Sequence, residues 1–168
     1  MQHMYTEPEA ARVSVEKTKK GYKVDSGAIR YEVADDSESI FTNVYDGRKT
    51  YTAANFEGPV LKDKDGNDYK LSIGEWRVVQ SGPVEVILAA KAHNIAGGAA
   101  YKDSTAKVEA DNILDDNHTF KDIEAEIRLT AYAGKPWVNV SYRIINTSND
   151  ELRIKSLVFY IKKSVDSI

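Results

Sequence analysis

Cysteine is absent from all 168 residues of the chain. The absence excludes a disulfide framework, a catalytic thiolate and a thiolate-ligated metal centre. No run approaches the ~18 apolar residues that a membrane-spanning helix needs, and the first residues lack the profile of a signal peptide. We therefore expect no membrane partner for the chain as written.

The chain also lacks a large excess of either positive or negative charge. The chain has 23 Lys and Arg against 26 Asp and Glu, a formal net charge of −3, and the two signs alternate along it. A nucleic-acid partner is therefore not expected, because such proteins carry basic patches. Neither a glycine-rich phosphate loop nor a G-x-S-x-G motif is present, so the sequence indicates no cofactor.

The dominant pattern is the alternation of apolar and polar residues with a period of two, which is typical of half-buried strands. Asp46-Gly47 joins two such strands, residues 40–45 and 49–52, in a predicted hairpin. Further alternating segments are residues 12–16, 22–24, 29–33, 120–132, 137–146 and 152–163. We predict an all-β, antiparallel β-barrel or sandwich of about ten to twelve strands with little or no helix.

Two regions depart from this pattern of half-buried strands. Residues 84–90 are rich in β-branched side chains, which suits a central strand buried on both faces. Residues 96–116 are rich in Gly, Ala and Asp, which indicates a long loop or excursion.

For domain organisation, we expect residues 1–4 to be an expression remnant. Residues 5–168 are expected to form a single β-barrel domain, a fragment of a longer multidomain protein.

Aromatic residues are the most informative candidates for binding, because sugar rings stack their C–H faces on flat side chains. The chain has ten Tyr and two Trp, and three of these residues lie beside predicted turns or strand ends: Trp76, Tyr132 and Trp137. We take these three as candidate carbohydrate-binding residues. The alternative is core or cross-strand packing, which is the commoner role of an aromatic side chain in a β protein.

An acidic turn between residues 59–61 and 69–73 offers a weak calcium candidate. Asp63, Asp65 and Asp68 supply carboxylate oxygens, the ligands that calcium prefers, but their spacing does not fit the EF-hand template. A polar hairpin turn is the alternative. His93 and His118 have no i,i+4 partner, so no metal site is predicted. No carboxylate pair stands out as catalytic, and no catalytic residue is assigned.

Several segments follow one another in an order that is shared with a known family. They are residues 27–33, 64–69 and 75–86, and residues 128–140, which include Ala133-Gly134-Lys135-Pro136-Trp137. In this order they resemble the N-terminal barrel of the exo-rhamnogalacturonan lyase and YetA-like proteins. The resemblance covers roughly residues 21–162.

The resemblance implies a RIFT-type β-barrel placed before a large α/α toroid that carries the lyase active site. It further implies a bacterial protein that is secreted, periplasmic or on the cell surface. Its partners would be the downstream catalytic domain of the same parent chain and a pectic polysaccharide. Three functions stay open: a non-catalytic accessory domain lining a carbohydrate cleft, a self-standing carbohydrate-binding module, and a structural or assembly subunit.

Overall fold

The computed structural model describes residues 10–96, 122–147 and 151–162, which form strands almost throughout. The strands are β1 (Ser14–Lys17), β2 (Gly21–Asp25), β3 (Arg30–Ala34), β4 (Asn43–Tyr45), β5 (Thr50–Thr52), β6 (Phe56–Asp63), β7 (Asp68–Ser81), β8 (Glu85–Ala96), β9 (Asp122–Tyr132), β10 (Val138–Ile145) and β11 (Ile154–Ile161). A single 3-10 turn, η1 (Ala53–Asn55), separates β5 from β6. The predicted all-β class is confirmed. Most of the segment predicted as a loop, together with His118, lies outside the described residues.

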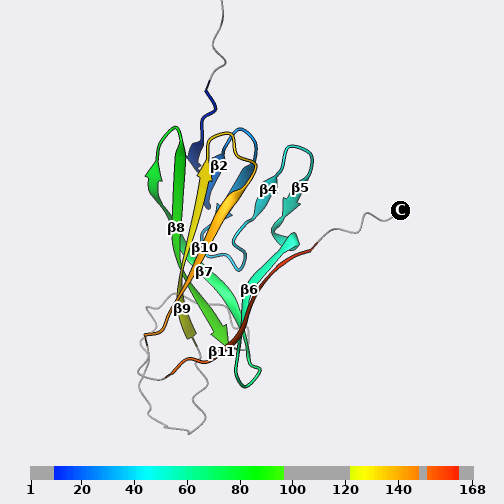
Figure 1. The fold of residues 1–168 in the computed structure, drawn as a ribbon, viewed down its shortest axis with the longest axis vertical. Helices are drawn as coiled ribbons and strands as arrows, with labels where there is room; N and C mark the ends of the chain where they lie inside the picture. Colours follow the sequence, from blue (N-terminus) through cyan, green and yellow to red (C-terminus); the bar gives the residue numbers. More distant parts are fainter. Residues whose placement is uncertain (1–9, 97–121, 148–150, 163–168) are drawn as a thin grey trace, which may run out of the picture.

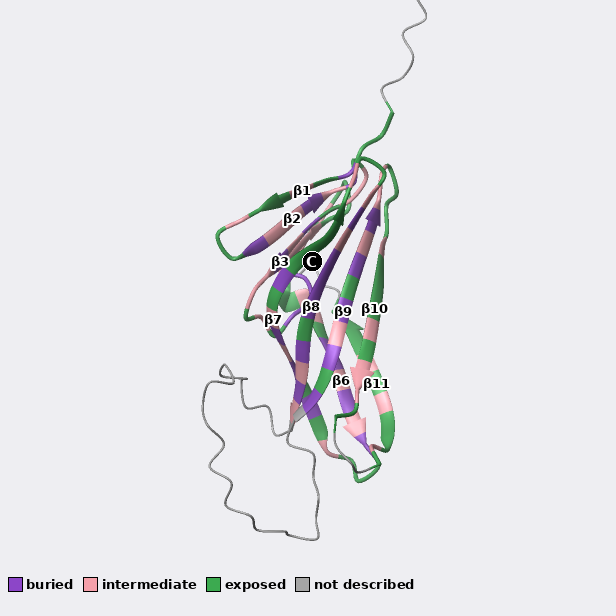
Figure 2. Cartoon of the chain, turned by 90° about the vertical axis from the view of Figure 1, so that its left-hand side faces the viewer, coloured by how far each residue is buried: buried purple, intermediate pink, exposed green. Residues whose placement is uncertain are grey.

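The strands build two antiparallel sheets (Figure 1). The first is a five-stranded meander in the order β1-β2-β3-β4-β5, and the second has six strands in the order β10-β9-β8-β7-β6-β11. The second sheet is curled into a half-barrel, and the first packs against one end of it (Figure 2). Both predicted hairpins are present, with Tyr45 opposite Thr50 and Leu61 opposite Tyr69.

The main core fills the space between the two sheets. Alternation along β9 buries Ile127 and Leu129, and the neighbouring strand β8 buries Leu88 on the same face. Tyr31 and Ile40 of the first sheet and its flanking loop pack against them in one cluster. Because β8 lies between β7 and β9, it is a central strand, as the sequence of residues 84–90 predicts. The expectation that both of its faces are buried is wrong, because Glu85 and Ile87 on its outward face stay partly exposed.

A buried polar group ties the curl of the six-stranded sheet together. Asn94 of β8 is fully buried, and its side-chain amide donates to the carbonyl of Pro59 in β6 (3.2 Å). Its amide oxygen accepts a hydrogen bond from the hydroxyl of Tyr142 in β10. One asparagine thus links strands β6, β8 and β10 across the interior, and a satisfied polar network of this kind fixes one arrangement of a core.

The last strand departs from the prediction. Successive strands β9 and β10 form a hairpin, but β11 pairs with β6 at the opposite edge of the sheet. No residue of β11 is buried, so the expectation that this strand buries one face is wrong. The reason is its position at a sheet edge, where side chains on both faces stay partly accessible.

Candidate functional site

Trp76 is a core residue, which corrects its prediction as a surface platform. Its side chain is only 2% exposed, and its indole N–H donates to the carbonyl of Ala34 (3.1 Å). Its backbone N–H donates to the carboxylate of Asp35 (2.8 Å), which ties β7 to the end of β3. A ring in this position has no free face for a sugar.

Tyr132 and Trp137 are brought together by the turn between β9 and β10. Their ring centroids lie 5.4 Å apart with an angle of 57° between the planes, a tilted aromatic pair. Trp137 is 48% exposed, whereas Tyr132 is half-buried. The Trp137 ring therefore retains accessible surface while Tyr132 supports it, which is the arrangement that a stacking platform requires.

Polar groups lie beside this aromatic pair on β7 and β8. Glu85 faces Tyr132 across the β8–β9 ladder and accepts a hydrogen bond from its hydroxyl. This bond, together with partial burial, raises the pKa of Tyr132 above its ordinary value. The side-chain amide of Gln80 donates to the same Glu85 carboxylate (2.9 Å). The pair is thus flanked by hydrogen-bonding groups of the kinds that bind sugar hydroxyls.

The turn that carries the pair is anchored to the first sheet through Ser26, which is fully buried. The backbone N–H of Gly134 donates to the carbonyl of Ser26 (2.6 Å). The hydroxyl of Ser26 donates to the carbonyl of Lys135 (2.8 Å). Two links across the sheets therefore hold the turn in one conformation, so that a ligand would meet a preorganised surface.

The three carboxylates that were candidates for binding calcium make hydrogen bonds and ion pairs within the acidic turn and its flanking strands. Asp63 accepts hydrogen bonds from the backbone of Asp65 and Asn67 (both 2.9 Å) and from the hydroxyl of Tyr69 (3.1 Å). Asp65 pairs with Lys64 instead, and Asp68 pairs with Lys62. The three carboxylates are engaged by different donors and do not converge on a common point.

Within residues 10–96, 122–147 and 151–162, no group of three or more His, Asp or Glu side chains is placed to share a metal ion. His93 lies opposite Glu124 in the ladder between β8 and β9. In the same parts of the chain, no helix has the length and apolarity that crossing a membrane requires.

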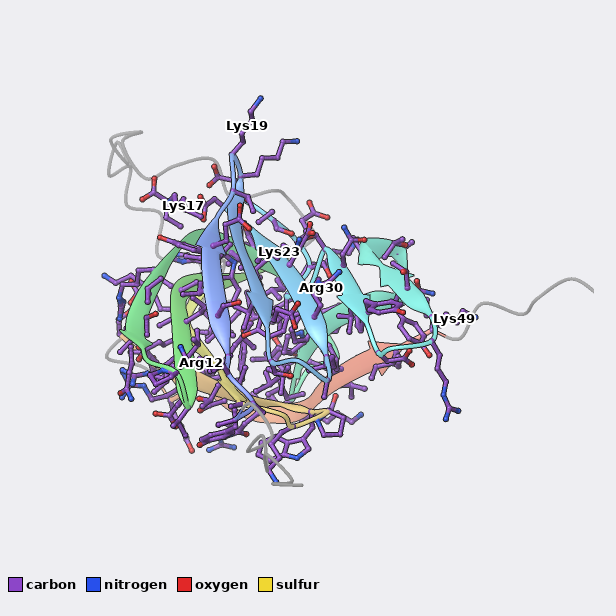
Figure 3. All side chains as sticks on the ribbon, turned by 90° about the horizontal axis from the view of Figure 1, so that it is seen from above. Arg12, Lys17, Lys19, Lys23, Arg30 and Lys49 are labelled. Atoms are coloured by element: carbon purple, nitrogen blue, oxygen red, sulfur yellow. The ribbon has the colours of Figure 1, made fainter. Side chains whose placement is uncertain are left out.

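A hollow that the sequence did not single out lies on the outward face of the first sheet. It has a volume of about 410 Å³ and is lined mainly by Lys23, Arg30, Glu32, Asn43, Tyr45 and Thr50. Lys23 and Arg30 come from the adjacent strands β2 and β3 (Figure 3). The guanidinium of Arg30 lies 5.9 Å from the centre of the Tyr45 ring. The period-two pattern places these residues on one face, but only the pairing register brings them together.

Comparisons with known proteins do not indicate a family or a function for the chain. No family model matches the chain. No curated protein matches it either. The resemblance to the lyase family therefore stays a prediction, and the functional argument starts from the exposed aromatic pair.

Proposed function

We propose that this chain is a non-catalytic accessory domain of a polysaccharide-lyase-like protein of the rhamnogalacturonan type, and that it lines one side of a carbohydrate cleft outside the cytoplasm. The observation that carries the proposal is the anchored, exposed pair of Tyr132 and Trp137 with Glu85 and Gln80 beside it. The order of segments over residues 21–162 supports the choice of parent protein.

The chemistry of the pair suits a saccharide. The apolar C–H face of a pyranose ring stacks on the free face of Trp137, and the Glu85 carboxylate accepts hydrogen bonds from ring hydroxyls. Because Ser26 already fixes the turn, binding loses little conformational entropy at the protein surface. A pectic polysaccharide is the ligand that fits the proposed parent.

Catalysis is assigned to the partner domain of the parent chain. Lyase chemistry on a uronate needs one group that neutralises the carboxylate and a base that removes the C5 proton. The carboxylate beside the aromatic pair, Glu85, already accepts hydrogen bonds from Tyr132 and Gln80. We therefore expect the isolated chain to produce no unsaturated uronate from pectic polymers, and ultraviolet absorbance of the reaction mixture measures this directly.

The edge strand β11 supports docking to a neighbouring domain. Five of its eight residues are exposed large hydrophobic side chains: Ile154, Leu157, Phe159, Tyr160 and Ile161. An apolar edge of this kind is costly to leave in water and is typical of an interface. The same strip would serve the alternative of an assembly subunit, which concentration-dependent self-association of the isolated chain would favour.

Calorimetric titration with pectic oligosaccharides tests the aromatic site. We expect saturable binding that Trp137→Ala abolishes, because the stacking face is removed while the exposed position contributes little to the core. Tyr160→Ala is the matched control, since Tyr160 is also 48% exposed but lies on β11 at the opposite edge. Binding that survives Trp137→Ala, or that Tyr160→Ala weakens equally, would contradict the proposal.

A further inference from the structure

The outward face of the six-stranded sheet carries three arginines around one glutamate. Glu126 of β9 contacts Arg143 of β10 at 2.7 Å, Arg128 of β9 at 3.2 Å and Arg77 of β7 at 3.6 Å. We call Arg77, Arg128 and Arg143 the arginine cluster. Its members come from three strands, so the cluster is a product of the pairing register and cannot be found as a sequence motif.

The register explains how the cluster forms. Arg143 lies directly opposite Glu126, and Ala89 of β8 lies between Arg77 and Arg128 in one row across the sheet. Alternate strands are about 10 Å apart, so the two arginines stand on either side of a single methyl group. The small side chain of Ala89, which is itself fully buried, leaves room for both guanidinium groups to lean toward Glu126.

The cluster has more positive charge than its own acid balances. Three guanidinium groups share one carboxylate, which leaves a local charge of +2 in a chain whose formal net charge is −3. Lys91 lies opposite Glu126 and adds a further cation, while Glu124 is the second carboxylate on this part of the face. With Lys91 and Glu124 included, four cations face two carboxylates, so this part of the face keeps its excess of two positive charges.

The arginines also keep most of their hydrogen-bonding capacity. Their side chains are 48 to 69% exposed, whereas Glu126 is only 13% exposed. Each guanidinium has five N–H donors, and Glu126 has only two oxygens to share among three groups. The glutamate therefore engages only part of each guanidinium group, and a partly exposed guanidinium keeps the donors that make bidentate contacts with an oxyanion.

We infer that the arginine cluster binds the oxyanion groups, carboxylate or sulfate, of an extended acidic glycan that lies along β9. Tyr132 lies on the same outward face, four residues beyond Arg128 and thus about 13 Å away along the strand. A short oligosaccharide spans that distance. The inference rests on the proposed function in placing the Trp137 platform and the cluster on one ligand, but the cluster has a binding readout of its own.

The test is a titration of the whole chain with three probes: polygalacturonate oligomers, sulfated dextran oligomers and neutral dextran oligomers. We expect the acidic probes to bind more tightly than neutral dextran, and the two acidic arms to distinguish carboxylate from sulfate. Arg128→Gln and Arg143→Gln should each lower the affinity for the preferred acidic probe about tenfold, as the loss of one charged hydrogen-bonding group does.

Arg30→Gln is the matched control. Arg30 is 47% exposed and is paired with Asp25 at 3.0 Å, so it has the same chemistry as Arg128, but it belongs to the first sheet. An equal loss on Arg30→Gln would show that only net charge matters and would overturn the inference. Equal affinity for a single-stranded DNA oligomer of the same charge would overturn it as well.

The two proposals fail in different ways. If Trp137→Ala leaves binding unchanged while Arg128→Gln weakens it, the aromatic platform is rejected and the arginine cluster stands. If Trp137→Ala abolishes binding while both arginine variants bind as the unchanged chain does, the cluster is rejected. Thermal unfolding of each variant, expected to match the unchanged chain because the substituted side chains are exposed, excludes misfolding as the cause.

Discussion

The two tryptophans of the chain differ in their surroundings because of one extra residue in a strand. Strict alternation from the buried Ile73 would place Trp76 on the outward face of β7. A register shift between Ile73 and Trp76 inserts a bulge, and the ring turns into the core instead. Trp137 follows a turn, and its side chain stays partly exposed to solvent. The sequence shows two similar aromatic candidates, and the bulge that separates them is a tertiary feature.

At the same scale, Asp63 predicts a dependence of stability on pH. Burial acts to raise its pKa, but hydrogen bonds from Asn67, Tyr69 and Asp65 outweigh this effect and lower it. Burial, together with the hydrogen bond to Asp63, raises the pKa of Tyr69 to about 12. A depressed carboxyl pKa stabilises the folded state above the unfolded value of about 3.9, and this contribution is lost as the pH falls further.

Asp63→Asn isolates this contribution because the amide keeps the size of the side chain and does not titrate. At pH 7 we expect the substitution to lower the free energy of unfolding by about 1.5–3 kcal/mol, the usual range for hydrogen bonds to a charged group. The difference should shrink toward pH 3 and below. Urea unfolding at both pH values measures it, and a gap that stays constant with pH would contradict the assignment.

At the scale of elements, the contact between β6 and β11 depends on Gly58. This residue has φ +100°, and a Cβ atom there would lie 2.6 Å from the backbone nitrogen of Val60 and 2.7 Å from the carbonyl oxygen of Val158 in β11. Gly58→Ala is therefore expected to lower the free energy of unfolding by about 1–3 kcal/mol from backbone strain, with the clash adding to this loss.

Gly66→Ala is the matched control for that substitution. Gly66 also has a positive φ, of +87°, but a Cβ atom there would meet no other atom within 4 Å. Its loss of stability should thus reflect backbone strain alone and be the smaller of the two in chemical denaturation. Equal losses in the two variants would show that the close backbone contacts at Gly58, with Val60 and with Val158 of β11, cost nothing.

Local hairpins were the elements that the sequence predicted best. The turns at residues 46–47 and 63–68 join strands that are neighbours in the chain, so turn chemistry alone fixes their pairing. The partner of β11 has no such local signal, because β6 lies about 100 residues earlier in the chain. Pairing across that distance depends on how the whole sheet curls.

At the scale of the molecule, stability should be uneven across the six-stranded sheet. Strand β8 is hydrogen-bonded to β7 and β9 and contributes Val86, Leu88 and Ala90 to the core. Strand β11 has one partner and no buried residue. We expect the amides of β8 to exchange with solvent deuterium at least about tenfold more slowly than the hydrogen-bonded amides of β11. Exchange mass spectrometry resolves the two segments, and equal rates would contradict this distribution.

By itself, the sequence determined the all-β class, the local hairpins and the buried face of β9, because period-two alternation and turn residues act over a few positions. Only the tertiary structure decided what the functional argument needs. The bulge at Trp76 removed one candidate, the Ser26 anchor fixed the Trp137 platform, and the register placed Arg77, Arg128 and Arg143 around Glu126. These features depend on contacts between residues that are distant in the chain, and local patterns carry no information about such pairings.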